Sequence, residues 1–118
     1  MTQSANHLEA NIKREITRAY KNSFGKGPEE TSVKVFSNVV FIKFDGGLTL
    51  MEQNLMALDR GRMLVRQIRD LLLKHNEDCV SAIENIVNSK LEESGYVFGK
   101  KDNAVYLTMV FDKEIEIH

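Results

Sequence analysis

The stretch from Gly25 to Arg69 constrains the fold of this chain more than any other part of its sequence. It opens with two glycines and a proline, passes through two runs rich in Val, Ile and Phe, and continues into a long helical pattern. Glycine and proline interrupt helices, whereas runs of β-branched and aromatic residues are typical of strands. The stretch therefore predicts a helix end, a β-hairpin and a new helix in direct succession.

Residues 5–23 come before this stretch and repeat apolar side chains at helical spacing, which predicts an amphipathic helix. Gly25 is a natural end for that helix, because glycine adopts the left-handed cap conformation without steric cost. Pro28 keeps the residue before it out of the helical conformation. We therefore expect the chain to turn here before the first strand begins.

Residues 32–36 and 39–45 have the composition of two strands. Only Ser37 and Asn38 separate them, a length typical of a tight hairpin turn in which Asn tolerates a positive φ. The sequence therefore predicts an antiparallel pair of strands at this point.

Thr49 and Glu52 have the spacing of a capping box, in which each side chain bonds the other residue's backbone N–H. The helical region that begins there extends to about Leu91. A single helix of that length is unusual in a small domain. We therefore expect a break near Asp59 or at residues 75–78.

Residues 96–99 and 104–111 predict a second hairpin, with residues 100–103 at its tip. The order helix–strand–strand–helix–helix–strand–strand then allows one four-stranded antiparallel sheet. We expect a single α+β domain over residues 1–118, with helices covering one face of the sheet. The last strand is apolar on one side and half apolar on the other, which suggests that a second copy covers part of the sheet.

The composition excludes several classes of function. A formal net charge of −1 gives no global attraction to nucleic acid, and no RNP or zinc-finger motif is present. No apolar run approaches the ~20 residues of a membrane helix, and the first residues have no apolar signal core. With Cys79 as its one cysteine, the chain has no intrachain disulfide. We expect a cytoplasmic protein that is peripheral at the inner face of the membrane if it acts there.

The turn formed by Gly25, Lys26, Gly27 and Pro28 has two interpretations. Exposed amides in a glycine turn beside a lysine suit a bound anion such as phosphate or bicarbonate, with Lys26 and Gly27 as ligands. The same residues also suffice as a helix stop followed by a sharp turn into a strand. The segment is not a Walker loop, because it lacks that motif and follows a helix.

Arg62, Arg66 and Arg69 have i, i+4 and i+7 spacing and so line one helix face. This basic stripe could bind an acidic partner, a lipid headgroup or an anion. It could also be a solvated face, because Asp59 and Asp70 stand at ion-pairing distance along the helix. Arg69 has no obvious local acid and is the strongest candidate for a function. The opposite arc carries the apolar side chains Leu64, Val65, Ile68, Leu71 and Leu72.

Other residues of the helical region suggest structural roles. Gly61 is costly inside a helix, which indicates a close approach of another element or a junction between two helices. His75 and Cys79 are four residues apart, as two metal ligands would be, but two ligands do not make a site. No nucleophile has a supported base, so we predict no catalytic residue, no metal and no cofactor.

These motifs together resemble the MpsC-like family, named for the soluble component of a sodium-translocating, membrane-potential-generating system. The resemblance covers about residues 8–91, whereas the second hairpin matches in outline only. It implies a bacterial or archaeal cytosolic protein associated with membrane subunits that move ions or support inorganic-carbon uptake. It rests on Gly25-x-Gly27-Pro28, the first hairpin, Gly47-Leu48-Thr49-x-x-Glu52 and Gly61-x-x-x-Val65-x-x-x-Arg69.

Three hypotheses for the function follow. The first is a non-enzymatic accessory or regulatory module, a homodimer that docks onto integral membrane subunits through Arg62, Arg66 and Arg69. The second is a sensor or enzyme that binds a small anion or nucleotide between the turn at residues 25–28 and Arg69. The third is a purely structural oligomerisation domain.

Overall fold

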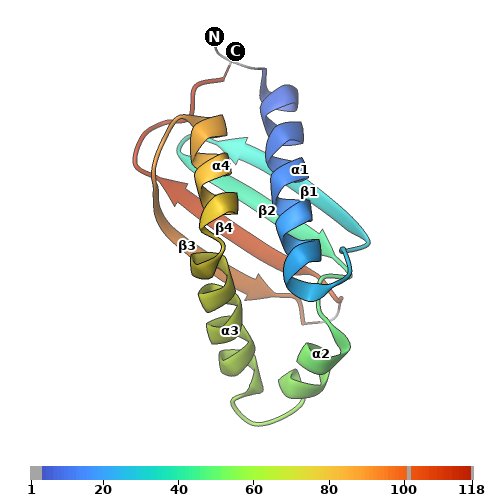
Figure 1. The fold of residues 1–118 in the computed structure, drawn as a ribbon. Coiled ribbons are helices and arrows are strands. Elements are labelled where there is room, and N and C mark those ends of the chain that lie inside the picture. The colour runs from blue at the N-terminus through green and yellow to red at the C-terminus, as the bar shows by residue number, and fades with distance from the viewer. Residues whose placement is uncertain (1–3, 101, 118) are drawn as a thin grey trace.

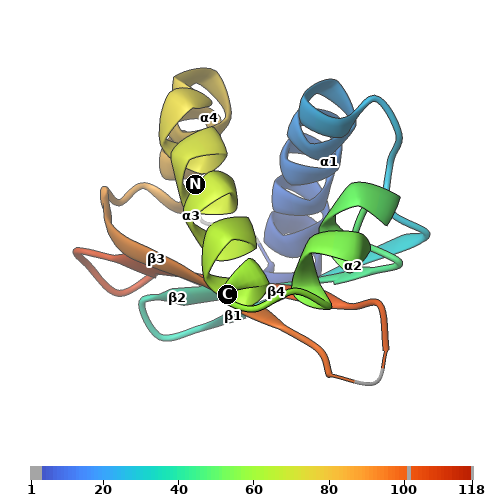
Figure 2. The same cartoon turned by 90° about the horizontal axis from the view of Figure 1, so that it is seen from below.

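The computed structural model describes residues 4–100 and 102–117, which form four helices and four strands. The strands make one antiparallel sheet in the order β1-β2-β4-β3, and the helices lie together on one of its faces (Figures 1 and 2). The predicted α+β class and order of elements are therefore confirmed. In chain order the elements are α1 (Ala5–Phe24), β1 (Glu30–Phe36), β2 (Val39–Asp45), α2 (Leu50–Met56), α3 (Gly61–His75), α4 (Glu77–Val87), β3 (Leu91–Phe98) and β4 (Val105–Phe111).

The hydrophobic core lies between the sheet and helices α1, α3 and α4. Alternate residues of β2 and β4 point toward the helices, as the two-residue period of a strand requires. α1 contributes one apolar stripe to the same core, which is the predicted amphipathic face. The buried residues of these three elements are Leu8, Ile12, Ile16, Tyr20, Val40, Ile42, Phe44, Val105, Leu107, Met109 and Phe111.

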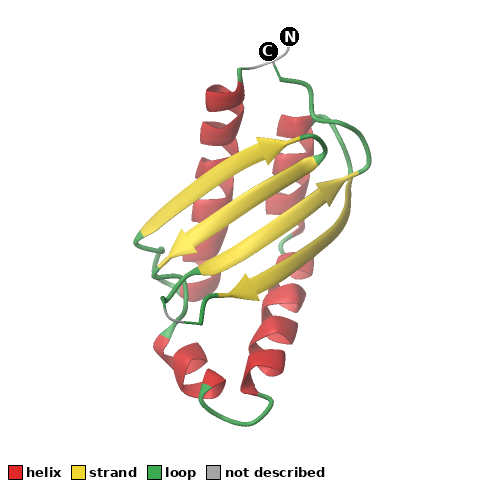
Figure 3. Cartoon of the chain, turned by 180° about the vertical axis from the view of Figure 1, so that it is seen from behind, coloured by secondary structure: helices red, strands yellow, loops and turns green. Residues whose placement is uncertain are grey.

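None of the helices formed by the described residues lies on the opposite face of the sheet, as Figure 3 shows from behind. We call this surface the outer face. Phe41 points outward at the centre of β2 and is 45% exposed, although the residues on either side of it are buried. The sheet is therefore covered on one side only, as the sequence predicted.

α1 begins and ends at the residues that the sequence indicated. The Ser4 hydroxyl accepts a hydrogen bond from the His7 N–H at 3.2 Å, so Ser4 is the N-cap. Gly25 adopts the left-handed conformation at φ 76°, and its N–H donates to the Lys21 carbonyl. The expected helix over residues 5–23 is one residue longer and ends at Phe24.

The first hairpin forms as predicted, but its two turn residues have different roles. Ser37 takes the positive φ of 57°, and Asn38 does not. The Asn38 amide instead donates to the Phe111 carbonyl at 2.9 Å, so it ties the turn to the end of β4. Local turn preferences do not predict a hydrogen bond to a strand that is so distant in sequence.

The long helical region breaks at both places where a break was expected, so it consists of three helices. Thr49 and Glu52 form the predicted capping box at the start of α2. Arg60 adopts a left-handed conformation between α2 and α3. Asn76 separates α3 from α4 and caps the latter, because its side chain accepts from the Cys79 N–H.

Gly61 lies at the junction of α2 and α3, where the two helices touch. A Cβ atom at this position would stand 1.5 Å from the Leu55 carbonyl oxygen. Both structural roles expected for Gly61, the close approach and the helix junction, are therefore present.

β3 begins earlier than predicted. α4 ends at Val87, and Asn88 leaves the helix in a left-handed conformation, so the expectation that helix continues to about Leu91 is wrong. Leu91 instead opens β3, five residues before the expected start. A register shift between Leu91 and Glu93 interrupts the alternation that marks a strand, which explains the difference. Of the predicted hairpin tip, Lys101 lies outside the described residues.

α2, the connection after it and the first part of α3 extend past the end of the sheet (Figures 1 and 3). We call residues 50–71 the α2–α3 arm. The chain measures 48 × 25 × 24 Å along its principal axes, so the domain is twice as long as it is wide. β2 leads directly into this arm, which places the arm at the end of the sheet where β2 finishes.

Candidate functional site

The most polar part of the interior is an ion pair between α2 and α3. Arg69 Nε lies 2.6 Å from Glu52 Oε2, and Arg69 Nη2 lies 2.6 Å from Glu52 Oε1. This is the bidentate geometry in which a guanidinium binds a carboxylate most strongly. Arg69 is only 1% exposed and Glu52 only 4% exposed. The acid that Arg69 lacked in its own helix is thus supplied by the capping box of α2.

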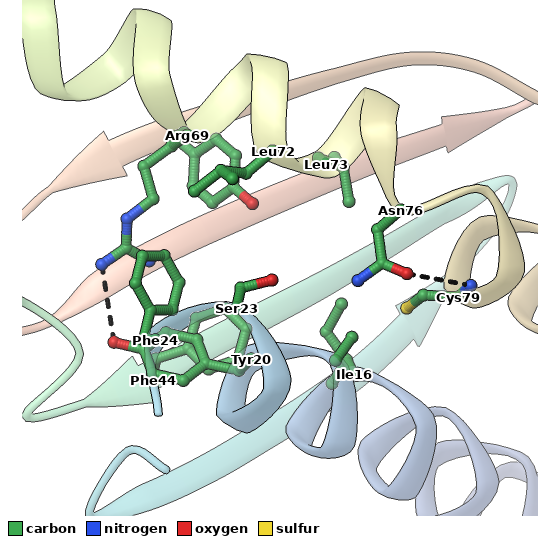
Figure 4. Close-up of a pocket in the computed structure, with 12 residues that line it drawn as sticks. Ile16, Tyr20, Ser23, Phe24, Phe44, Arg69, Leu72, Leu73, Asn76 and Cys79 are labelled. Atoms are coloured by element: carbon green, nitrogen blue, oxygen red, sulfur yellow. Dashed lines mark hydrogen bonds between the residues drawn. The ribbon is translucent and has the colours of Figure 1, made fainter. Parts of the chain in front are cut away.

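The Gly47 carbonyl and the Tyr20 ring complete this network. The carbonyl oxygen of Gly47 accepts a hydrogen bond from Arg69 Nη2 at 2.7 Å and a second one from the Tyr20 hydroxyl. The Tyr20 hydroxyl also lies 3.5 Å from Arg69 Nη2 (Figure 4). The Phe24 ring packs on the guanidinium, whose central carbon is 4.2 Å from the ring centroid. Helices α1, α2 and α3 therefore converge on one arginine.

The electrostatics of the network keep the pair ionised. Burial alone would raise the pKa of Glu52, but hydrogen bonds from Arg69 and from the Thr49 backbone and hydroxyl bring it below the ordinary 4.5. Burial likewise disfavours the charged form of Arg69, and the Glu52 carboxylate reverses this so that the pKa of Arg69 rises. For Tyr20, burial prevails over the nearby guanidinium, and the pKa of the hydroxyl is raised. The directions of these pKa shifts favour an ionised Glu52, a positively charged Arg69 and a neutral Tyr20 hydroxyl, which are the forms that their hydrogen bonds require.

A small cavity lies beside the network, between α1 and α3. Its lining, drawn in Figure 4, includes the polar residues Ser23 and Asn76 and the apolar residues Ile16, Leu72 and Leu73. Its volume is about 40 Å³, which is room for about three water molecules. A nucleotide does not fit this space.

The predicted anion ligands are not equivalent in the structure. Lys26 is exposed and Gly27 is half-buried in the turn after α1, where a Cβ on Gly27 would meet no atom within 4 Å. Arg69 is buried beneath Phe24 and is already neutralised by Glu52. A guanidinium paired in this way has little charge left for a further anion. Within the turn, Gly25 ends α1 as the sequence predicted. Anion binding by Lys26 and Gly27 stays a prediction.

Arg62 and Arg66 bind the backbone of β3, which is an edge strand of the sheet. Arg62 Nη2 donates to the Phe98 carbonyl at 2.8 Å, and Arg66 Nε donates to the Tyr96 carbonyl at 3.2 Å. The Arg66 guanidinium also lies 5.9 Å from the Phe98 ring centroid. The basic stripe therefore satisfies carbonyls that an edge strand leaves without a partner.

This placement corrects the interpretation of the stripe as a solvated face. Arg62 and Arg66 are held by carbonyls rather than by the local acids Asp59 and Asp70. Arg69 is buried in the network, Arg62 is half-buried and Arg66 is exposed. The arginine face of α3 points toward the body of the protein, because β3 and α2 lie on that side.

The apolar arc of α3 is exposed in consequence. Leu64, Ile68 and Leu71 follow one another at i, i+4 and i+7 spacing and all face solvent, whereas Val65 and Leu72 turn toward the core. Exposed apolar side chains continue along the rest of the arm. We call this set the apolar arm surface: Leu50, Met51, Leu58, Met63, Leu64, Ile68 and Leu71.

His75 and Cys79 belong to different helices, so the single-helix spacing that suggested a pair of ligands does not apply. The Cys79 thiol faces the Glu15 carbonyl of α1 at 3.9 Å, and burial raises its pKa to about 11. His75 is exposed at the end of α3. Within residues 4–100 and 102–117, no group of three His, Cys, Asp or Glu side chains is arranged to hold a metal ion.

The sequence analysis did not connect Tyr20 or Gly47 with Arg69. A signal for Tyr20 was present, since it is the one hydroxyl-bearing residue among the buried positions of α1. Gly47 is buried, and a Cβ there would stand 2.8 Å from the Phe44 Cβ atom. Its importance lies in its carbonyl group, about which side-chain patterns carry no information.

Comparison with known proteins identifies the family. A family model described as "Na⁺-translocating membrane potential-generating system (MpsC)" matches residues 4–113. No curated protein and no solved structure gave a significant match. Among the described helices, none has both the length and the apolar character needed to cross a membrane. Since the family model covers nearly the whole chain, the protein belongs to the MpsC family.

Proposed function

We propose that this protein is a non-enzymatic accessory or regulatory module of an ion-translocating membrane complex. In this proposal it acts as a cytoplasmic homodimer, and the α2–α3 arm docks onto an integral membrane subunit at the inner face of the membrane. The family description supports the membrane system, and the apolar arm surface is the observation that supports docking.

The apolar arm surface is unusual for a protein that acts alone. Leu50 is 73% exposed, Leu58 is 63% exposed and Leu71 is 66% exposed, and all three lie on the same projecting segment. Monomeric proteins rarely expose contiguous apolar patches beyond a few hundred Å². Grouped exposure of this kind is typical of a surface that binds another protein.

The shape of the arm supports a helix-in-groove contact. Leu64, Ile68 and Leu71 form a straight row on α3, which is the pattern by which an amphipathic helix binds a groove on a partner. The arm extends beyond the sheet, so this row can enter a groove without obstruction by the body of the domain. Arg66, the exposed member of the basic stripe, would lie at the rim of the contact.

The test is co-purification of the tagged protein from gently solubilised membranes of its own host, with identification of the partner by mass spectrometry. The wild type is expected to recover an integral membrane subunit. The variant Leu64→Glu with Ile68→Glu is expected to lose it, because two charges cannot be buried in an apolar groove. Lys74→Glu is the matched control, since it changes the net charge by the same amount on the exposed side of the same helix.

The folded state of each variant is verified by circular dichroism before binding is compared. Recovery of the same subunit by wild type and Lys74→Glu, with loss in the double variant, supports the docking role. Equal recovery by all three proteins would show that another surface is responsible. Recovery of no membrane subunit by the wild type would refute the accessory role itself.

A further inference from the structure

We infer that two copies of this chain pair through the outer faces of their sheets, about a two-fold axis that runs parallel to the strands. In this arrangement Lys34 on β1 of one copy lies beside Glu93 on β3 of the second copy. The inference rests on the homodimer of the proposed function and specifies its surface and its symmetry. It does not depend on docking by the arm.

The strand register arranges the outer face in three rows. Alternate residues of each strand share a face, and their partners across the sheet follow from the pairing. Apolar and aromatic side chains dominate these rows, while Lys34 and Glu93 lie on the two edge strands. Lys43 lies on the central strand β2 and pairs with Asp45 at 3.5 Å. The rows are Phe36–Val39–Val110–Glu93, Lys34–Phe41–Thr108–Gly95 and Ser32–Lys43–Tyr106–Val97.

Several of these apolar side chains are open to solvent in the single chain. Phe36 and Val97 are well exposed near two corners of the face, and Phe41 is partly exposed at its centre. The chain has an accessible surface of 7533 Å², compared with about 6,500 Å² for a typical monomer of its mass. This surplus of about 1,000 Å² is spread over the whole elongated chain, including the α2–α3 arm. The outer face contributes to it through Phe36, Phe41 and Val97.

The edges of the sheet are less suitable for a second copy than its outer face. At β1, the Val35 N–H donates to the Glu9 carboxylate at 2.9 Å. At β3, the Leu91 N–H donates to the Glu84 carboxylate at 2.8 Å, and Arg62 and Arg66 bind the two carbonyls described above. Pairing of strands edge to edge would have to break these hydrogen bonds. Face-to-face packing leaves all of them intact.

The charges distinguish a symmetry axis perpendicular to the strands from one parallel to them. An axis perpendicular to the strands places β1 on β1 and brings the two copies of Lys34 together, which is repulsive. An axis parallel to the strands places β1 on β3, so that Lys34 meets the side of the sheet that carries Glu93. It also places Gly95, which has no side chain, opposite Lys34. The charges are complementary only in the second case.

The experiment measures the dimer dissociation constant by sedimentation equilibrium for the full chain and its variants. Phe41→Glu is expected to leave a monomer, because it buries a charge at the centre of the interface. Lys34→Glu and Glu93→Lys are each expected to weaken the dimer about three- to tenfold. The double variant Lys34→Glu with Glu93→Lys restores both opposite-charge contacts and should return to the wild-type constant. Lys13→Glu, exposed on α1, is the control for a change in net charge.

The outcomes separate this inference from the proposal on which it rests. A wild type that stays monomeric at high concentration overturns both the homodimer and its geometry. If Phe41→Glu still forms a dimer, the outer-face geometry is wrong. It is also wrong if the double charge reversal does not restore the wild-type dissociation constant. In either case the homodimer itself is not refuted. Loss of the dimer in Phe41→Glu, with rescue in the double variant and no effect of Lys13→Glu, establishes it. A circular dichroism spectrum and thermal melt show that each variant is folded.

Discussion

Arg69 of α3 and Glu52 of α2 form a bidentate ion pair that the surrounding helices and loop almost completely close off from solvent. The same carboxylate caps α2, so one side chain both starts that helix and binds the next one. The pair also reaches α1 through Tyr20 and the Gly47 carbonyl. The ion pair therefore joins α2 and α3 to α1 and to the loop after β2, in addition to the hydrogen bonds by which Arg62 and Arg66 hold α3 to β3.

Removal of the arginine should destabilise the protein strongly. Arg69→Met leaves the Glu52 carboxylate buried without a counter-charge, which typically costs about 3–5 kcal/mol in the free energy of unfolding. Urea denaturation measures this loss. The double variant Glu52→Gln with Arg69→Met should be more stable than Arg69→Met alone, because it leaves no buried charge.

Arg18→Met provides the control for this prediction, because Arg18 pairs with Glu15 on the exposed side of α1. An exposed pair contributes less than about 1 kcal/mol, so this variant should stay close to the wild type. If the two arginine substitutions had equal effects, the buried network would contribute no more to stability than an ordinary surface contact.

The ion pair should also make the protein sensitive to acid. The pKa of Glu52 is lower in the folded state than its ordinary value of 4.5, so the folded state binds this proton less readily than the unfolded chain does. The stability that Glu52 contributes is therefore present above pH 4.5 and is lost as the pH falls through the folded-state pKa. Urea titrations between about pH 7 and pH 3 should show a steeper loss for wild type than for Glu52→Gln. Parallel curves would contradict this.

Gly61→Ala should destabilise the domain although alanine is the better helix former. The new methyl group would collide with the Leu55 carbonyl oxygen, which belongs to a backbone that cannot move aside cheaply. We expect a loss of about 1–3 kcal/mol in the free energy of unfolding, as overpacking usually causes. Gly27→Ala is the matched control, since its Cβ would enter open space. A thermal melt that is unchanged by Gly61→Ala would mean that α2 and α3 separate easily.

Cys79 should react slowly with thiol reagents in the native protein. Burial raises its pKa from 9.0 to about 11, so the reactive thiolate is scarce at pH 8, and the side chain is shielded by α1. Labelling with iodoacetamide should be slow in buffer and fast in concentrated urea, which mass spectrometry detects directly. Rapid labelling of the native protein would indicate frequent opening between α1 and α4.

The sequence predicted local features well because their causes are local. The capping box of Thr49 and Glu52, the left-handed Gly25 and the close approach at Gly61 each follow from a residue type and its immediate neighbours. The start of β3 was missed because its register shift near Leu91 removes the alternating pattern on which strand prediction depends. Even the correct order of elements carried no information on the strand order β1-β2-β4-β3.

The orientation of α3 could not be predicted from the sequence, and the reason is tertiary. Periodicity shows that a helix has an apolar arc, but burial of that arc depends on what lies beside it. Here the helix projects past the sheet, so Leu64 and Leu71 are exposed while Arg69 is buried. Glu52, the partner of Arg69, lies 17 positions earlier in the sequence and in a different helix. The i, i+4 spacing that predicts ion pairs within one helix therefore does not apply to this pair.

β2 leads straight into the α2–α3 arm, which fixes the arm at one end of the sheet. A symmetry axis parallel to the strands would keep that end the same in both copies, so the proposed dimer would carry two arms side by side. Once one arm engages a membrane complex, the other would meet its site at an effective concentration in the millimolar range. Two individually weak contacts would then hold the module firmly, and dissociation of the dimer by dilution would release it.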